Sequence, residues 1–200
     1  MKPFFSYYGG KYRAAKHYPP PKYTVVEPFA GSAGYSVWHE PKVAILCDVD
    51  PVICALWRYL IRVSSQEILS LPDIRNDQTV NDLNVCEEAR YLIGFWLSVG
   101  SSVPNKSPAK WMRDYNSGNA DWIRSQLFWS ARVRNRIASQ LDKIRSWHVI
   151  NRSYDHIHTH TPATWFIDPP YNNAAGRHYR FSDINYLHLA AWCGLRNGQV

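Results

Sequence analysis

Residues 23–46 combine a short buried strand, a glycine-rich turn, a helix and a second buried strand, and this order narrows the possible folds more than any other feature of the chain. The first strand is the β-branched run at residues 23–27, and the turn after it reads Pro-Phe-Ala-Gly-Ser-Ala-Gly. The second is the apolar run at residues 43–46, which stops at Cys-Asp-Val-Asp. Strands linked by a helix in this way are the parts of a parallel βαβ unit. The sequence therefore predicts an α/β fold with a mainly parallel sheet.

Further elements are predicted from the spacing of apolar residues and from the residues that start and stop helices. Pro51 stands where a first-turn proline would open a helix, and another apolar strand stops at Asp168-Pro-Pro-Tyr. In addition to the two strands above, the sequence predicts helices at residues 13–17, 52–63, 87–99 and 184–195, and strands at residues 148–151, 164–167 and 198–200.

The middle of the chain has a different character. Residues 98–119 are polar and rich in Gly, Ser, Pro and Asn, which predicts a mobile loop. From Asp121 a long amphipathic helix is expected, because apolar side chains recur at helical spacing. These side chains are Ile123, Leu127, Val133, Ile137, Leu141 and Ile144.

Most of the positive charge lies in that same region. The net charge is +7, and residues 104–146 hold nine Lys and Arg against three Asp. A one-sided basic surface repels itself unless an anion relieves it, so the excess favours contact with nucleic-acid phosphates. A solvated helix face is the alternative. The candidate DNA contacts are Lys106, Lys110, Arg113, Arg124, Arg132, Arg134 and Arg136.

Other features exclude membrane and secreted classes of protein. The chain has no run of about 18 apolar residues that could cross a membrane. Its first residues lack both the apolar core and the small-residue cleavage site of a signal peptide. Four separated cysteines with no Cys-x-x-Cys pair are typical of reduced thiols and not of disulfides or a zinc site; they are Cys47, Cys54, Cys86 and Cys193. We therefore expect a cytoplasmic protein with no membrane partner.

The glycine-rich turn at residues 27–34 is a candidate ligand site. Gly31 and Gly34 would let a ligand approach the backbone, and the helix that follows favours negative ligand groups. Asp48 ends the next strand 21 residues after Glu27, which suits a carboxylate that receives the ribose hydroxyls of a nucleoside. The third glycine of the dinucleotide fingerprint is missing, which argues against NAD. A tight turn without a ligand is the alternative.

The tetrapeptide Asp168-Pro169-Pro170-Tyr171 is a candidate amine-binding site. Prolines donate no hydrogen bond and keep the backbone stiff, so their carbonyls are fixed acceptors. With Asp168 they could hold both N–H groups of an amine, while Tyr171 stacks on its ring. Such acceptors orient the nitrogen lone pair toward a methyl donor, which suits methylation of an exocyclic base amine. An ordinary turn is the alternative.

Two further patterns indicate no site. His156, His158 and His160 alternate along the chain but lack cysteine or further carboxylate ligands nearby, so they predict a polar loop and no metal. The triplet that ends at Lys11 is no phosphate-binding loop, because Tyr12 replaces the required Ser or Thr and the leading glycine is missing.

In chain order, the segments FSYYGGKYR, VVEPFAGSAG, CDVD and FIDPPY resemble the motifs of the S-adenosylmethionine-dependent DNA adenine-N6 methyltransferases related to the DNA adenine methylase. The resemblance covers about residues 3–62 and 147–196. It implies a Rossmann-like, three-layer methyltransferase domain at residues 1–85 and 147–200, with a helical, basic target-recognition insert at residues 86–146. It also implies metal-free transfer of a methyl group to N6 of an adenine flipped out of double-stranded DNA, in a bacterial or phage-infected cell.

The same resemblance implies roles for individual residues. The turn would hold the methionine part of the cofactor, Asp48 its ribose hydroxyls, and Tyr171 would stack on the flipped adenine. Asp168 would lie between the cofactor and the target amine, beside a carbonyl from Pro169. The residues implied to bind the cofactor are Tyr7, Lys11, Glu27, Pro28, Phe29, Gly31, Gly34, Asp48 and Asp168. Those implied in catalysis are Asp168, Pro169, Pro170 and Tyr171.

The chain departs from these relatives in two places. They carry a glycine- and asparagine-containing hairpin that residues 98–119 do not match, so the DNA sequence recognised stays open. They also continue past the strand at residues 198–200, which implies that the last strands of the sheet are missing here. Three other functions stay open: cytosine-N4 methylation, RNA methylation, and DNA binding by a truncated, non-catalytic methylase-like protein. Aspartate instead of serine before Pro-Pro-Tyr favours adenine.

Overall fold

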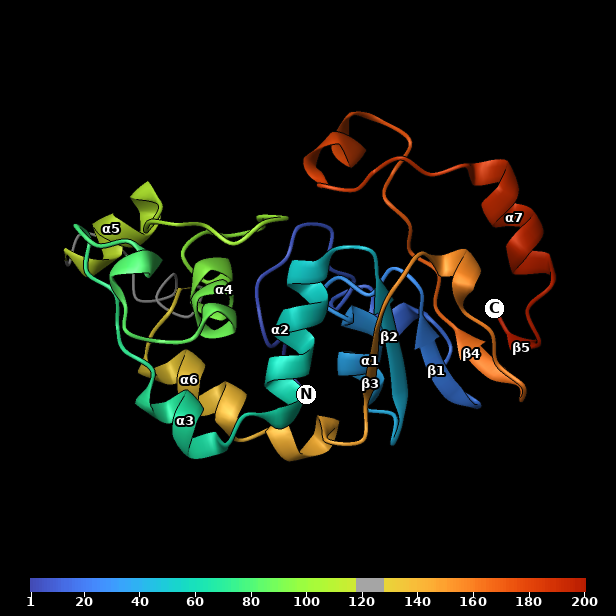
Figure 1. Ribbon diagram of the computed structural model, residues 1–200, viewed down its shortest axis with the longest axis horizontal. Coiled ribbons are helices and arrows are strands. Elements are labelled where there is room, and N and C mark those ends of the chain that lie inside the picture. The colour runs from blue at the N-terminus through green and yellow to red at the C-terminus, as the bar shows by residue number, and fades with distance from the viewer. Residues whose placement is uncertain (118–127) are drawn as a thin grey trace.

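The computed structural model describes residues 1–117 and 128–200. The described residues contain a five-stranded, all-parallel sheet in the order β3-β2-β1-β4-β5 (Figure 1). The strands are β1 (Thr24–Glu27), β2 (Ala44–Asp48), β3 (His148–Asn151), β4 (Ala163–Trp165) and β5 (Gly198–Gln199). The predicted α/β fold is confirmed, and it is consistent with a Rossmann-like fold.

The strand order reverses beside β1. From β1 the chain steps to β2 and then β3 on one side, and β4 returns to pair with the other edge of β1. The register aligns Val25 with Ala44 on one side and with Thr164 on the other. Where the order of a parallel sheet reverses, a crevice opens at the carboxyl ends of the strands, because the connecting segments leave in opposite directions. The glycine-rich turn after β1 and Asp168 after β4 both lie at this crevice.

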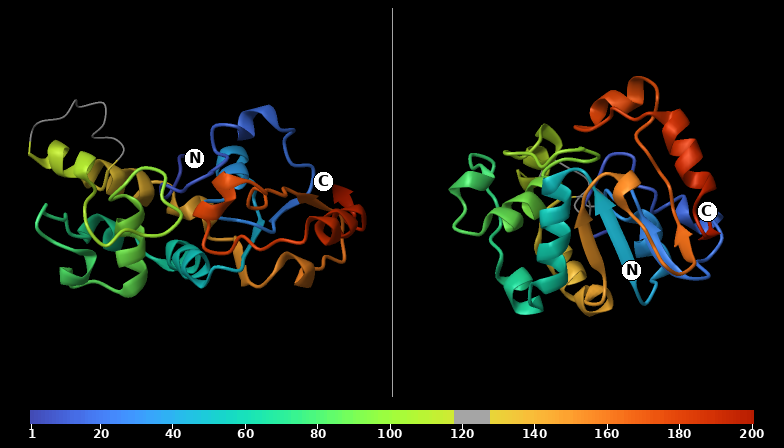
Figure 2. Two further views of the ribbon diagram at one scale, coloured as in Figure 1. Left: turned by 90° about the horizontal axis from the view of Figure 1, so that it is seen from above. Right: turned by 45° about the vertical axis from the view of Figure 1, so that its right-hand side comes forward.

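Both faces of the sheet bury apolar side chains. Successive strand residues point to opposite faces, so Val25 joins a large core with helices α1 (Gly34–His39) and α2 (Pro51–Arg62). Val26 joins a second core that includes Leu189 and Trp192 of helix α7 (Tyr186–Gly194). Figure 2 shows α2 and α7 on either side of the strands. The sheet is therefore covered on both faces, as the short apolar strands predicted.

Helix α2 forms where its sequence predicts. The Asp50 side chain accepts a hydrogen bond from the Val52 N–H at 2.9 Å and caps the first turn, and Pro51 occupies a position that needs no N–H. Its buried side chains recur at helical spacing; they are Ile53, Cys54, Leu56, Trp57 and Leu60. The helix therefore presents one apolar face to the core.

The remaining α-helices lie together at the end of the molecule away from β5 (Figure 1). They are α3 (Ser65–Ser70), α4 (Glu87–Phe95), α5 (Lys110–Asn116) and α6 (Ala131–Ala138). Ile68 of α3, Leu92 of α4 and Ile137 of α6 belong to the same core as the sheet. Helix α3 was not predicted, and it packs against α6, so this helical group begins before residue 86.

Two expectations for the middle of the chain are wrong. The polar stretch at residues 98–119 contains α5, in which Met112 is buried and Lys110 pairs with Asp114 at 3.1 Å. The buried Met112 side chain and the ion pair between residues one helical turn apart stabilise this helix, which the polar composition of the segment does not predict.

The long helix expected from Asp121 is the second error. Its residues 121–127 lie outside the described residues. Residues 128–130 are not helical, α6 ends at Ala138, and a 3₁₀ helix follows at Leu141–Ile144. Between the two, the buried Gln140 side chain accepts from the Lys2 N–H at 2.9 Å and donates to the Lys2 carbonyl at 2.7 Å. This tie to the N-terminal segment coincides with the break in the helix.

Candidate active site

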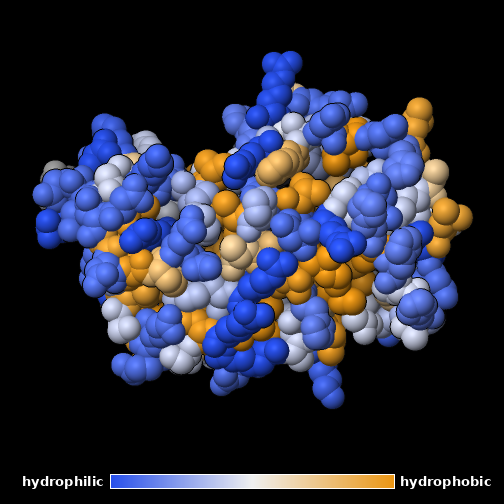
Figure 3. All heavy atoms as spheres, viewed as in Figure 1, coloured by the Kyte–Doolittle hydropathy of each residue, from blue (hydrophilic) through white to orange (hydrophobic). Residues whose placement is uncertain are grey.

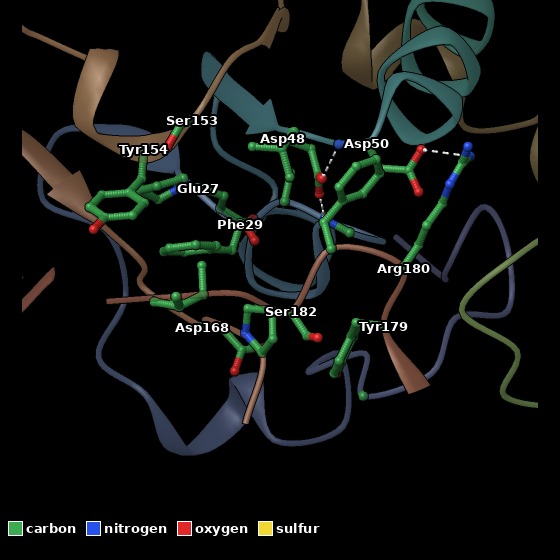
Figure 4. Close-up of a pocket in the computed structure, with 18 of the residues that line it drawn as sticks. Glu27, Phe29, Asp48, Asp50, Ser153, Tyr154, Asp168, Tyr179, Arg180 and Ser182 are labelled. Carbon is green, nitrogen blue, oxygen red and sulfur yellow. Dashed lines mark hydrogen bonds and ion pairs between the residues drawn. The ribbon is translucent and has the colours of Figure 1, made fainter. Parts of the chain in front are cut away.

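A cavity of about 610 Å³ opens at the carboxyl ends of β1, β2, β3 and β4 (Figure 4). All nine residues predicted to bind a cofactor line it: Tyr7, Lys11, Glu27, Pro28, Phe29, Gly31, Gly34, Asp48 and Asp168. Of the four predicted catalytic residues, Asp168 and Pro170 line it. Pro169 and Tyr171 do not, although the Tyr171 hydroxyl contacts the lining residue Lys11. The volume lies within the range of small-molecule sites. The structure therefore brings Asp48 and Asp168 into one shared site.

The glycines of the turn make room for the chain's own N-terminal segment. Gly31 has a φ of +45°, and a Cβ there would lie 2.8 Å from the Tyr7 ring. A Cβ on Gly34 would lie 2.5 Å from the backbone nitrogen of Tyr12. Both glycines also line the cavity, so the turn serves the packing of the N-terminal segment in addition to the predicted approach of a ligand. By packing closely on residues 7–12, the turn brings Tyr7 and Lys11 to the cavity.

Asp48 is held rigidly at the end of β2. Its Oδ2 accepts the Gly31 N–H and its Oδ1 accepts the Asp50 N–H, both at 2.9 Å. A carboxylate has about four acceptor positions, so each oxygen keeps one for a ligand hydroxyl. Burial raises the pKa of Asp48 to about 6, and these N–H groups oppose the rise. Asp48 is therefore mostly ionised at neutral pH.

Glu27 is a buried carboxylate at the end of β1. It accepts a hydrogen bond from the Ser36 N–H at 2.8 Å and so ties the strand to the start of α1. Burial raises its pKa to about 7, against the opposing hydrogen bonds from Ser36, and the charge of Asp168 adds to the rise. At higher pH the fold therefore bears the cost of a buried charge.

We expect Glu27→Gln to raise the free energy of unfolding at pH 8, by up to about 3 kcal/mol for a pKa shift of this size. The folded state holds the Glu27 proton up to about pH 7, whereas the unfolded chain releases it near the ordinary pKa of about 4.5. The gain in unfolding free energy is therefore complete above pH 7, and it shrinks to zero as the pH falls from about 7 to about 4.5. Urea unfolding of both proteins at several pH values measures it.

Glu67→Gln is the matched control for this prediction, because Glu67 is exposed on α3. Its effect should stay within about 0.5 kcal/mol at each pH. An unfolding free energy for Glu27→Gln that falls at pH 8 would show that the ionised carboxylate stabilises the turn.

Asp168 follows β4 and pairs closely with Lys11. The Lys11 ammonium lies 2.6 and 2.7 Å from the two carboxylate oxygens and 2.6 Å from the Tyr171 hydroxyl. Burial raises the pKa of Asp168, and the Lys11 charge opposes this rise. Burial alone would lower the pKa of Lys11, but its hydrogen bonds to Asp168 and Tyr171 raise it. The close pairing therefore favours the charged form of each group.

The Asp-Pro-Pro-Tyr segment differs from its prediction in one respect. We expected both proline carbonyls to face outward as acceptors. The Pro170 carbonyl instead accepts a hydrogen bond from the Tyr186 hydroxyl of α7. This bond holds the segment against α7, and within the cavity lining it leaves Asp168 as the acceptor from this segment that an amine could use.

The structure adds lining residues that sequence reasoning missed. Tyr154 follows β3 and lies 5.3 Å from the Phe29 ring, with its hydroxyl 2.8 Å from Nδ1 of His188. Across the cavity, Arg180 approaches Asp50 at 3.9 Å (Figure 4). Tyr154 could have been found from its place after a parallel strand. The segment around Arg180 has no sequence signal, because only the tertiary fold carries it over the strand ends.

The cavity is strongly acidic. Six carboxylates line it: Glu27, Asp48, Asp50, Asp155, Asp168 and Asp183. The Lys and Arg side chains among its lining residues are Lys11 and Arg180, and each lies against one of these carboxylates. Such a site repels phosphate groups and attracts a cationic ligand.

The basic residues predicted to contact DNA separate into two groups. The exposed ones are Lys106, Lys110, Arg113 and Arg132. Arg134 is instead buried against Asp73 at 2.5 Å, and Arg136 packs over the Trp96 ring at 4.8 Å. These two placements correct the expectation that both side chains belong to a one-sided basic face, because Arg134 pairs with Asp73 and Arg136 lies against Trp96. Arg124 lies outside the described residues.

In residues 1–117 and 128–200, no group of three or more His, Cys, Asp and Glu side chains is arranged to hold a metal ion. None of their helices has the length and apolar character needed to span a membrane. Comparison with known protein families gives no matching family model, and comparison with curated proteins gives no significant match.

Proposed function

We propose that this protein transfers a methyl group from S-adenosylmethionine to the N6 amine of adenine in DNA. The observation that carries the proposal is the shared cavity, in which Asp48 at the end of β2 and Asp168 after β4 meet at the reversal of strand order. Open α/β sheets bind nucleosides at such points. The resemblance of the four sequence motifs to DNA adenine methyltransferases, and their order along the chain, also supports the proposal.

The chemistry of the cavity fits this cofactor. Its adenosine part has two ribose hydroxyls, and Asp48 keeps one acceptor position on each oxygen for them. Phe29 and Tyr154 offer aromatic surface for a purine ring. The excess of carboxylates suits a sulfonium cation and disfavours cofactors that carry phosphates.

The residues after β4 fit the reaction. The cofactor supplies an electrophilic methyl group on sulfur, and the amine nitrogen attacks it while the sulfur keeps the electron pair of the broken C–S bond. Asp168 would accept one N–H of the amine, orient the nitrogen lone pair, and receive or pass on the proton that the nitrogen loses. Tyr171, 38% exposed at the rim, is placed to stack on a base brought in from outside.

The binding half of this proposal is tested with S-adenosylhomocysteine, the demethylated cofactor, by isothermal titration calorimetry. The expected result is binding that persists in the presence of NAD or ATP, because both competitors carry phosphates into an acidic cavity. Binding of either phosphate cofactor in place of S-adenosylhomocysteine would contradict the assignment.

DNA is the partner that the remaining surface favours. The helical group formed by α3, α4, α5 and α6 is largely hydrophilic at its upper left in Figure 3, with apolar atoms below. Lys106 and Lys110 are exposed, and neither lines the acidic cavity. We assign the phosphate contacts to the exposed cations of residues 86–146, which would serve as the target-recognition region.

We expect the double variant Lys106→Gln and Lys110→Gln to flatten the salt dependence of DNA binding. Each phosphate contact contributes about 0.9 to the slope of log affinity against log salt, so the slope should fall by up to about 2. Fluorescence anisotropy with a DNA duplex at several salt concentrations measures it.

The matched control replaces Lys22 and Lys42 by Gln. Both are exposed and directly precede β1 and β2, at the opposite edge of the sheet from the cavity. Their slope should equal that of the unaltered protein. Equal slopes for both double variants and the unaltered protein would remove Lys106 and Lys110 from the interface.

A further inference from the structure

The ammonium of Lys11 is fully engaged in the structure. It donates to both oxygens of Asp168, to the Tyr171 hydroxyl and, at 3.2 Å, to the Gly9 carbonyl. An ammonium has three protons, and four acceptors surround this one. Lys11 therefore has no proton left for another ligand while it stays in this position.

The acceptor that Lys11 occupies is the one that an incoming amine needs. In the proposed reaction Asp168 accepts an N–H of the target amine, and Tyr171 lies beside the same base. Both the ammonium and the exocyclic amine are nitrogen donors of similar reach to a carboxylate. While Lys11 donates to both oxygens, the amine meets a carboxylate whose charge is already paired, so the two donors compete for Asp168.

The surroundings of Asp168 make an unpaired state costly. Its side chain is 24% exposed and that of Lys11 is 18% exposed. A carboxylate so far removed from water is destabilised unless a donor pairs with it. The resting site therefore needs a donor, and a different donor can replace it at little cost.

The backbone of Lys11 is fixed, so its side chain is the part that can move. The start of α1 packs against residues 11 and 12, where Gly34 leaves no room for a Cβ. Gly9, with a φ of +70°, lies against Tyr179 and leaves no room for a side chain either. Rotamer changes of a lysine side chain are fast compared with catalysis.

On the basis of the function proposed above, we propose that Lys11 is a positioning residue that stands in for the target amine. In the resting site its ammonium fills the donor position against Asp168 and Tyr171, and the adenine amine displaces it on entry. A base without this amine leaves the ammonium in place, so part of the binding that an amine gains is used to displace Lys11.

The test compares two oligonucleotides in the presence of saturating S-adenosylhomocysteine at pH 8. One is oligodeoxyadenylate, and the other carries unsubstituted purine, which lacks the 6-amino group. The dissociation constant of the purine oligonucleotide divided by that of oligodeoxyadenylate measures the contribution of the amine. In Lys11→Met the amine meets an unpaired carboxylate instead of an occupied one, so this ratio should rise about tenfold, the value of a hydrogen bond to a charged group.

Lys42→Met, at the opposite edge of the sheet, is the control and should leave the ratio unchanged. If Lys11→Met does not fold, Lys11→Gln replaces it, with a smaller rise expected because a neutral amide competes less than an ammonium. If Lys11 were purely structural or contacted phosphate, its replacement would weaken the binding of both oligonucleotides equally and leave the ratio unchanged. That result would overturn the proposal.

The outcomes also separate this proposal from the function on which it rests. No binding of S-adenosylhomocysteine to the unaltered protein would refute the proposed function. With that binding intact, an unchanged ratio in the Lys11 variants would refute the role of Lys11 alone, whereas no binding of either oligonucleotide would refute DNA as the substrate in the proposed function.

Discussion

Asp168→Asn is expected to lose methyl transfer by about a thousandfold or more while it still binds DNA. Asparagine has an NH2 group in place of one carboxylate oxygen, and this group is a hydrogen-bond donor. It would face the target amine, which is also a donor, so the amine would lose the acceptor that orients it. Removal of one group that stabilises a transition state costs about 100- to 1,000-fold. Here the loss of the negative charge beside a nitrogen that becomes positive adds to this cost. Initial rates with tritium-labelled cofactor and unmethylated DNA measure the effect.

DNA affinity should persist because the exposed cations Lys106 and Lys110 lie on the helical group, apart from the cavity. Asp142→Asn is the matched control, since the Asp142 side chain is 93% exposed and pairs with Arg145. Its rate should equal that of the unaltered protein. Methyl transfer by Asp168→Asn within tenfold of normal would remove Asp168 from the chemistry.

Asp48→Asn is expected to weaken the binding of S-adenosylhomocysteine on the order of a hundredfold, the value of two hydrogen bonds to a charged group. The new amide nitrogen would also face a backbone donor, either Gly31 or Asp50, where Asp48 now accepts from both. Ribose hydroxyls would then meet one acceptor oxygen in place of two. Calorimetry at pH 8, where Asp48 is ionised, measures the change.

Asp77→Asn gives the same chemical change at an exposed position, with 76% of the side chain accessible. Its affinity should equal that of the unaltered protein. If Asp48→Asn also bound normally, the ribose would have to lie elsewhere in the cavity, and the spacing argument from Glu27 to Asp48 would fail.

The strands of the sheet could be predicted in large part from short-range patterns. The runs at β1, β2, β3 and β4 carry their own signal, because each is a short stretch of strand-forming residues followed within three residues by a polar side chain. Since parallel strands place their carboxyl ends at one edge, the residues after β1, β2 and β4 had to share that edge. The common position of Asp48 and Asp168 follows from this rule.

Other parts of the site depend on contacts between distant segments. The pairing of Lys11 with Asp168 joins residues 157 positions apart, and no local pattern specifies it. Arg134 has the composition of a surface cation, yet its burial against Asp73 depends on how α6 packs. Helix α5 was hidden for a related reason, because only the packed structure shows that Met112 is buried.

Methyl transfer to adenine is measured by incubation of the unaltered protein with methyl-labelled S-adenosylmethionine and unmethylated double-stranded DNA, followed by digestion and mass spectrometry of the nucleosides. We expect labelled N6-methyladenine, and none with Asp168→Asn. Label in N4-methylcytosine would contradict the choice of base. Binding of both cofactor and DNA without any labelled nucleoside would contradict the assignment as an enzyme.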